Sequence, residues 1–191
     1  PYWLKNSAWM LCAFAFLILI APATAQAEKK ARYTVEDDVW NPPFNDQRQR
    51  EQKIYTPLEK GQKKRRIRVF IPHLKDDYWL WVNYGLINEA RRLGVSLSIY
   101  EAGGYDQLAV QRRQIEENLK EITDGLIIGA ISLDGLNDLV KKAADQGIPV
   151  LDLINGMSSL HIAARAAVSF WDMGNRAGSY LQGLQGKNGK P

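Results

Sequence analysis

From residue 67 onward, short apolar runs alternate with longer stretches in which apolar residues recur every three or four positions. The short runs have the length of β-strands, and the longer stretches have the spacing of amphipathic helices. Strands that alternate with helices in this order predict a parallel sheet with right-handed crossovers, which is an α/β fold. The expected strands are residues 67–71, 95–100, 126–131, 148–154 and a short fifth at 166–170, and the expected helices are 80–93, 107–121, 135–146 and 171–184.

Residues typical of helix ends flank these helices. Gly94 and Gly147 follow the last apolar positions of two helices, as expected for glycine at a helix C-terminus. Asp106 and Asp134 stand just before two helix starts, so we expect their carboxylates to cap those helices.

Residues 1–27 have the pattern of a secretory signal peptide. Lys5 precedes an apolar run over residues 8–20, and small residues at Ala-x-Ala spacing follow, which predicts cleavage after Ala25 or Ala27. The alternative is a membrane anchor, but the run is shorter than the roughly 20 apolar residues that a spanning helix needs. We therefore expect a soluble exported protein.

Residues 28–66 are polar and carry no persistent helix or strand period, so we expect an extended leader. The basic cluster of residues 63–66 and Arg68 could bind nucleic acid, or it could be a solvated turn before the first strand. No aromatic residues are interleaved with it to stack on bases, and the net charge of the chain is only +4. The sequence therefore favours the solvated turn.

Aromatic residues gather where the expected strands end. A parallel sheet brings the carboxyl ends of its strands to one edge, where ligands of open α/β folds bind. Tyr78, Trp79, Tyr105 and Trp171 reach that edge from three separate segments. Aromatic faces attract methylated cationic nitrogen, and tyrosine O–H and tryptophan N–H groups donate hydrogen bonds to an oxyanion. These four side chains are candidate ligand contacts, with core packing as the alternative.

Neighbours of these aromatics have other candidate roles. Trp81 and Tyr84 lie farther into the first helix, so we expect them to pack in the core or against another lobe. Asp76 and Asp77 could complement a positive charge, bind sugar hydroxyls, or cap the helix that follows them.

Residues for catalysis or metal binding are sparse. The chain has one cysteine, Cys12, and two histidines, His73 and His161, which do not make up a metal site or a disulfide. It has no Gly-x-Ser-x-Gly motif and no dinucleotide fingerprint. A hydrolase would rest on Ser158, Ser159 and His161 alone, without an orienting acid. We expect no enzyme activity, no metal and no cofactor.

The chain resembles the type I periplasmic binding proteins, and within them the branch that senses trimethylamine N-oxide. The resemblance runs from about residue 54 to the end, and its most specific part is residues 75–113. The residues that carry it are 75–80 (KDDYWL), 83–85 (NYG), 89–92 (EARR), 101–105 (EAGGY), and Trp171 before 172–174 (DMG).

This resemblance implies a two-lobed protein in which residues 67–191 form a three-layer, parallel-sheet N-terminal lobe and the second lobe is absent from this fragment. It implies that trimethylamine N-oxide or a similar methylamine binds between the lobes, and that the periplasmic sensor domain of a hybrid histidine kinase is the partner. The implied ligand contacts are Tyr78, Trp79, Tyr105 and Trp171, with Asp76 nearby. Because one lobe cannot close around a ligand, we expect weak or no binding by this chain alone.

The substrate-binding protein of a sugar-type ABC transporter is the alternative, since it shares the fold. Sugar sites also stack aromatic rings, but they surround the sugar with polar side chains. The expected rim is richer in tryptophan and tyrosine than in such groups, which are limited to Asp76, Asp77, Asp106 and Asn155.

Overall fold

The computed structural model describes residues 35–39, 51–55, 57–168 and 170–185. The expected signal peptide lies outside these residues. None of the helices among them is both long and apolar enough to cross a membrane.

The leader contains two strands that the sequence pattern did not predict. β1 (Val35–Val39) and β2 (Glu51–Tyr55) pair antiparallel, with Val35 opposite Tyr55 and Val39 opposite Glu51. Strands of five polar-rich residues show no clear alternation, so only the pairing of their backbones reveals them.

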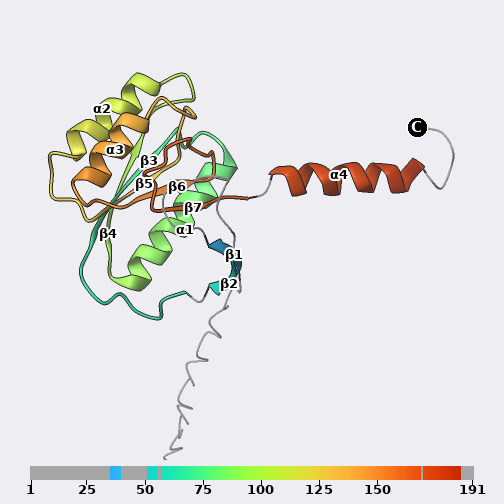
Figure 1. The fold of residues 1–191 in the computed structure, drawn as a ribbon, viewed down its shortest axis with the longest axis horizontal. Coiled ribbons are helices and arrows are strands. Elements are labelled where there is room, and N and C mark those ends of the chain that lie inside the picture. The colour runs from blue at the N-terminus through green and yellow to red at the C-terminus, as the bar shows by residue number, and fades with distance from the viewer. Residues whose placement is uncertain (1–34, 40–50, 56, 169, 186–191) are drawn as a thin grey trace, which may run out of the picture. The chain divides into compact units, whose positions relative to one another are not determined.

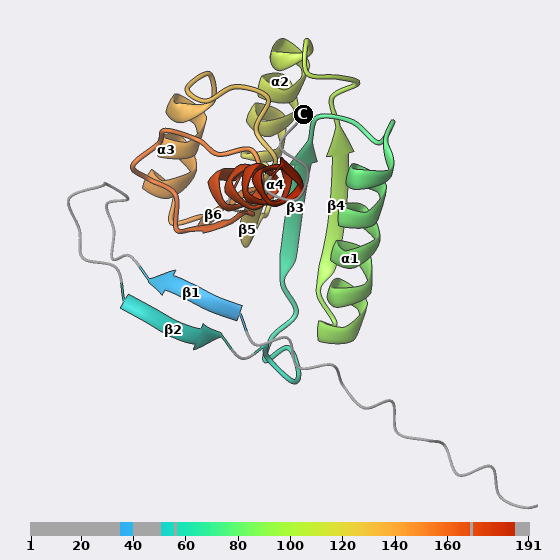
Figure 2. The same cartoon turned by 90° about the vertical axis from the view of Figure 1, so that its right-hand side faces the viewer.

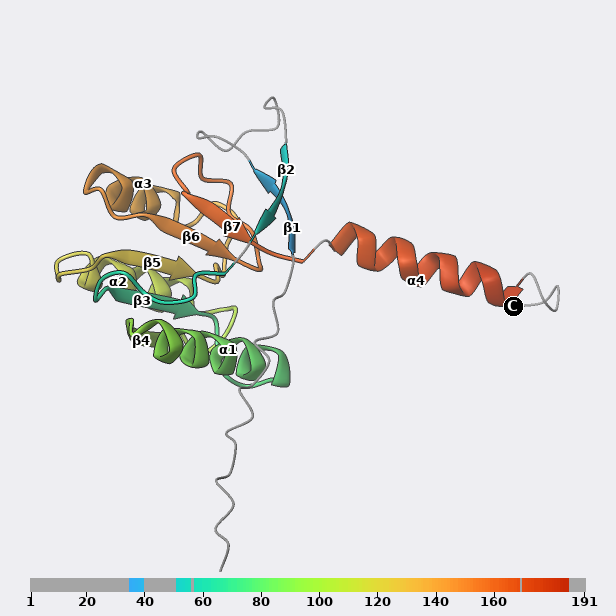
Figure 3. The same ribbon diagram turned by 90° about the horizontal axis from the view of Figure 1, so that it is seen from below.

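A five-stranded parallel sheet forms the centre of the remaining chain, which confirms the expected α/β fold. Its strands stand in the order β4-β3-β5-β6-β7, and Figure 3 shows them side by side in this order. Every neighbouring pair is parallel. The strands are β3 (Arg66–Ile71), β4 (Ser96–Glu101), β5 (Gly125–Ile128), β6 (Val150–Leu153) and β7 (Ala164–Ala166).

Helices cover both faces of this sheet and make three layers. The first helix, α1, lies on one face, and α2 and α3 lie on the other (Figure 1). Figure 2 shows α1 alongside β4, with α2 and α3 across the sheet from it. The helices are α1 (Asp77–Leu93), α2 (Leu108–Asn118), α3 (Asn137–Asp145) and α4 (Phe170–Gln185).

The alternation of strand side chains divides the core between the two faces. Val69 and Ile71 of β3 pack with Trp79 of α1, whereas Phe70 packs with Ile115 of α2 and its neighbours. The larger cluster lies under α2 and α3. Ile67 of β3 and neighbouring apolar residues of β5 and β6 line a groove of about 310 Å³.

Two expected helix caps and the position of one strand differ from expectation. Neither Asp106 nor Asp134 caps a helix, because turns fill the gap: Gln107 N–H donates to the Gly104 carbonyl, and Asn137 N–H donates to the Asp134 carbonyl. The fifth strand, expected at 166–170, lies at Ala164–Ala166. The expected glycine at the end of α1 is confirmed, since Gly94 has φ +68°.

Candidate functional site

The loops that follow β3, β4 and β6, together with the first turn of α1, bring five side chains together at the carboxyl edge of the sheet. One ring contact, three hydrogen bonds and a contact of 3.8 Å between His73 Nε2 and Asp76 Oδ2 connect them. We call this group the rim cluster, and it consists of His73, Asp76, Trp79, Tyr105 and Asn155.

Trp79 is the buried member of the rim cluster on which the Tyr105 side chain rests. It lies in the first turn of α1 and is only 1% exposed. Its ring packs so closely over Gly129 that a Cβ atom there would lie 2.6 Å from Cη2 of the indole. Its Nε1–H donates a hydrogen bond of 3.1 Å to the Tyr105 hydroxyl. Contact of Trp79 with a ligand stays a prediction, since the observed role of its N–H is to hold Tyr105.

Tyr105 is the exposed aromatic of the rim cluster. It follows a tight loop in which Gly103 and Gly104 have φ of +99° and +157°, values that favour glycine. Lys75 Nζ donates to the Gly103 carbonyl, and Gly104 N–H donates to the Pro72 carbonyl. These bonds tie the loop after β4 to the loop after β3.

His73 supports the Tyr105 ring from the side. The centroids of the two rings are 5.2 Å apart and the rings are nearly perpendicular, at 79°. His73 Nδ1 accepts a hydrogen bond from the N–H of Lys75, which leaves Nε2 as the donor nitrogen of the ring. That nitrogen lies 3.8 Å from Oδ2 of Asp76.

Asp76 is the N-cap of α1. Its Oδ1 accepts a hydrogen bond of 2.9 Å from Trp79 N–H, which is the geometry of a capping carboxylate. Capping was one of the three roles that the sequence left open for Asp76. Its other oxygen faces His73, so part of its charge stays at the rim.

Asn155 was placed in a rim segment by the sequence but was not counted among the ligand contacts. Its Nδ2 donates a hydrogen bond of 2.8 Å to the Ala130 carbonyl and lies 3.5 Å from the Tyr105 hydroxyl oxygen. The preceding residue, Ile154, has φ +69°, a strained value for a β-branched side chain, and Asn155 N–H donates across it to the Leu153 carbonyl. An Asn-Gly pair directly after a buried strand was the available signal for this turn.

A buried carboxylate holds the loop that carries Asn155. Oδ2 of Asp152, which is fully buried, accepts from Met157 N–H at 2.8 Å and from Nε of Arg165 at 2.6 Å. The same guanidinium donates a hydrogen bond of 2.6 Å to the Met157 carbonyl. These bonds fix the start of the loop between β6 and β7.

The other expected ligand contacts are only partly brought together. The half-exposed Tyr78 meets Trp79 edge to face, with ring centroids 6.1 Å apart. Trp171 lies on α4, where every side chain that the structure describes is exposed. It is 75% exposed and has no ring contact with Tyr78, Trp79 or Tyr105 among the described residues. Its place in a ligand site stays a prediction.

Trp81 and Tyr84 do not pack in the core, so that half of the expectation is wrong, and their packing against another lobe stays a prediction. They are 70% and 59% exposed and contact each other edge to face, with ring centroids 5.9 Å apart. Trp79 and Ala90 mark the buried side of α1, and the helical period turns Trp81 and Tyr84 away from it.

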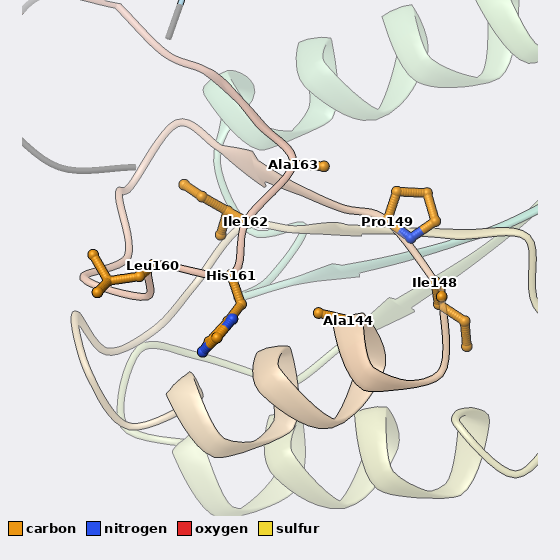
Figure 4. Close-up of a pocket in the computed structure, with 8 residues that line it drawn as sticks. Ala144, Ile148, Pro149, Leu160, His161, Ile162 and Ala163 are labelled. Carbon is orange, nitrogen blue, oxygen red and sulfur yellow. The ribbon is translucent and has the colours of Figure 1, made fainter. Parts of the chain in front are cut away.

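Another groove lies at the opposite edge of the sheet from the rim cluster. It measures about 660 Å³ and is bounded by the end of α3 and by the segments before β6 and β7. Figure 4 shows His161, its only ionisable lining residue, between Leu160 and Ala144. No group of three or more potential metal ligands occurs in the part of the chain that is described. The rim cluster is therefore the better candidate for a polar ligand.

Known proteins share this architecture. The chain is 38% identical to the periplasmic protein TorT of Escherichia coli K12 over 136 residues, which is 71% of this chain and 38% of TorT. It thus spans less than two fifths of that relative. The structure of an ABC transporter solute-binding protein from Bradyrhizobium sp. BTAi1 with bound bis-tris matches with a TM-score of 0.71 and 47% identity, over 78% of this chain and 45% of that one.

A second solved structure joins the fold to a partner. A complex of the TorS sensor domain with TorT, without ligand, matches with a TM-score of 0.57 and 31% identity, over 62% of this chain and 41% of that one. The model of the periplasmic binding protein domain matches residues 67–190. The parallel sheet, its rim and these matches agree with the resemblance seen in the sequence: the chain belongs to the periplasmic binding protein family.

Proposed function

We propose that this chain is the N-terminal part of a periplasmic sensor protein that binds trimethylamine N-oxide or a similar small methylamine and signals to a hybrid sensor histidine kinase. The carrying observation is the rim cluster, in which aromatic rings and hydrogen-bond donors stand together at the ligand edge of a periplasmic binding protein lobe. Similarity to TorT and to the TorS sensor domain–TorT complex supports the partner.

The chemistry of the rim suits such a ligand. Trimethylamine N-oxide has a methylated positive nitrogen and a negative oxygen. Tyr78 and Tyr105 offer exposed ring faces to the first, at about 0.5–2 kcal/mol per contact. The Tyr105 hydroxyl can donate to the second. Trp171 would supply a further face if the complete protein brings it to the rim.

Titration calorimetry of the full-length protein tests the ligand. We expect saturable binding of trimethylamine N-oxide, weakened by Tyr105→Ala and unchanged by Tyr180→Ala, which alters an exposed tyrosine of α4. Full affinity in the Tyr105→Ala variant would contradict the assignment. Co-elution of the full-length protein with the kinase sensor domain tests the partner separately.

The alternative is a substrate-binding protein of an ABC transporter. The Bradyrhizobium match favours it, because that relative is a solute-binding protein and shares 47% identity. A permease and an ATPase gene beside this one, and tighter binding of a sugar than of the methylamine, would support transport. A neighbouring kinase gene would support sensing.

A further inference from the structure

The hydrogen bonds around Tyr105 define the direction in which its hydroxyl can act. Trp79 Nε1–H is a donor only, and it points at the Tyr105 oxygen from 3.1 Å. One lone pair of the hydroxyl oxygen therefore accepts the indole N–H, and the indole ring is held in place because it is buried.

Asn155 presents a second donor to the same oxygen. The Ala130 carbonyl, 2.8 Å away, can only accept, so the NH₂ end of the amide must face it. The second hydrogen of that NH₂ group is left for the Tyr105 oxygen at 3.5 Å. The strained turn at Ile154 holds Asn155 in this position.

A hydroxyl oxygen has two lone pairs and one hydrogen. With both lone pairs facing donors, the Tyr105 O–H hydrogen must point elsewhere, and no side chain or backbone group in the described ranges accepts it. We propose that Tyr105 acts solely as a hydrogen-bond donor toward the ligand and that Asn155 enforces this direction. The site then selects a methylamine that carries an acceptor oxygen. This inference rests on the proposed function and deepens it.

Two probes of nearly equal size test the selection. Trimethylamine N-oxide carries an acceptor oxygen, and tetramethylammonium has a methyl group in its place. In the full-length protein we expect tighter binding of the N-oxide. Tyr105→Phe keeps the ring but removes the donor, so it should lower N-oxide affinity about tenfold or more and leave tetramethylammonium affinity unchanged.

Asn155→Asp tests the positioning role. A carboxylate accepts from the Tyr105 O–H and turns its hydrogen inward, so the ratio of N-oxide to tetramethylammonium affinity should fall about tenfold. Asn88→Asp makes the same change on an exposed part of α1 and should leave the ratio unaltered. Thermal unfolding establishes whether each variant is folded. If Asn155→Asp does not fold, Tyr105→Phe still tests the donor role of Tyr105.

The outcomes separate the two levels of the proposal. If the unmodified protein binds neither probe, the proposed function fails and this inference with it. If both bind but Tyr105→Phe leaves their ratio unchanged, the inference alone is overturned. If Tyr105→Phe lowers the ratio of N-oxide to tetramethylammonium affinity but a folded Asn155→Asp variant leaves it unchanged, Tyr105 donates without help from Asn155. The positioning role of Asn155 is then overturned.

Discussion

Trp79 and Tyr105 are 26 positions apart in the sequence, and a hydrogen bond of 3.1 Å from the indole Nε1–H to the tyrosine hydroxyl joins them. Through this bond the first turn of α1 and the loop after β4 share one side-chain cluster. The buried partner fixes the exposed one, so a ligand at the rim would meet a tyrosine that is already oriented.

Gly129→Ala tests the packing beneath Trp79. The new Cβ would lie 2.6 Å from Cη2 and 3.1 Å from Cζ3 of the indole and 3.5 Å from Cδ of Pro72. Because the ring is buried, we expect a loss of about 1–3 kcal/mol in the free energy of unfolding, measured by urea titration. Gly85→Ala is the control: its Cβ meets nothing within 4 Å in an exposed part of α1, so it should add about 0.5–1 kcal/mol. Equal stability of the two variants would contradict the packing.

Asp76 can be divided into a capping role and a charge role. Asp76→Ala should cost about 1 kcal/mol of stability, because Trp79 N–H loses its acceptor. Asp76→Asn keeps an acceptor oxygen and should stay within a few tenths of a kcal/mol of the unmodified protein. Thermal unfolding of both variants measures the difference. An Asp76→Asn variant as unstable as Asp76→Ala would show that the carboxylate charge, rather than the cap, stabilises the fold.

Arg165→Met would leave the fully buried carboxylate of Asp152 without its guanidinium partner. Loss of one member of a buried pair costs about 3–5 kcal/mol, and we expect the lower end because the Arg165 side chain is 30% exposed. Adding Asp152→Asn to this variant removes the uncompensated charge and should restore part of the stability. Denaturant unfolding of the single and double variants checks this, and a double variant less stable than Arg165→Met would oppose it.

Acid should weaken the contact between α2 and α3. Hydrogen bonds of 2.7 and 2.6 Å from the Arg112 guanidinium, with its positive charge as a smaller cause, hold the pKa of Asp138 below its ordinary value of 3.8. The folded state therefore binds this proton less readily than the unfolded state. The stabilisation is complete above the ordinary pKa and is lost as the pH falls below it, through the lowered pKa of the folded state.

Unfolding measured between pH 7 and pH 2 tests this pH dependence. Asp138→Asn should make the stability curve less steep in the acid range. Other carboxylates share the trend, since the backbone N–H of Arg66 lowers the pKa of Asp124, and a side-chain hydrogen bond from Arg92 lowers that of Glu89. Asp145→Asn, at an exposed i,i+4 pair with Lys141, is the matched control, and an equal change in both variants would contradict the special role of Asp138.

The sequence by itself determined the order and type of the main elements. Apolar runs of strand length alternate with apolar periods of helix length from residue 67 onward. A parallel sheet follows from that order, because each helix brings the chain back to the edge of the sheet where the preceding strand began. The same pattern placed Tyr105 and Asn155 at the carboxyl edge. It also identified Asp76 as a possible cap, since short polar side chains before a helix satisfy its free N–H groups.

Only the tertiary structure decided which of these residues meet. Periodicity predicts a helix from about residue 80, but not that it begins early enough to include Trp79, that the Trp79 N–H reaches Tyr105, or that Trp81 and Tyr84 face away from the core. The Ile154 turn and the donors around the Tyr105 hydroxyl depend on strands distant in sequence, whose relative positions are set by the packing of the sheet. The local sequence pattern indicates the secondary structure that one segment prefers. The direction of a hydrogen bond depends on two segments at once, so only the folded chain determines it.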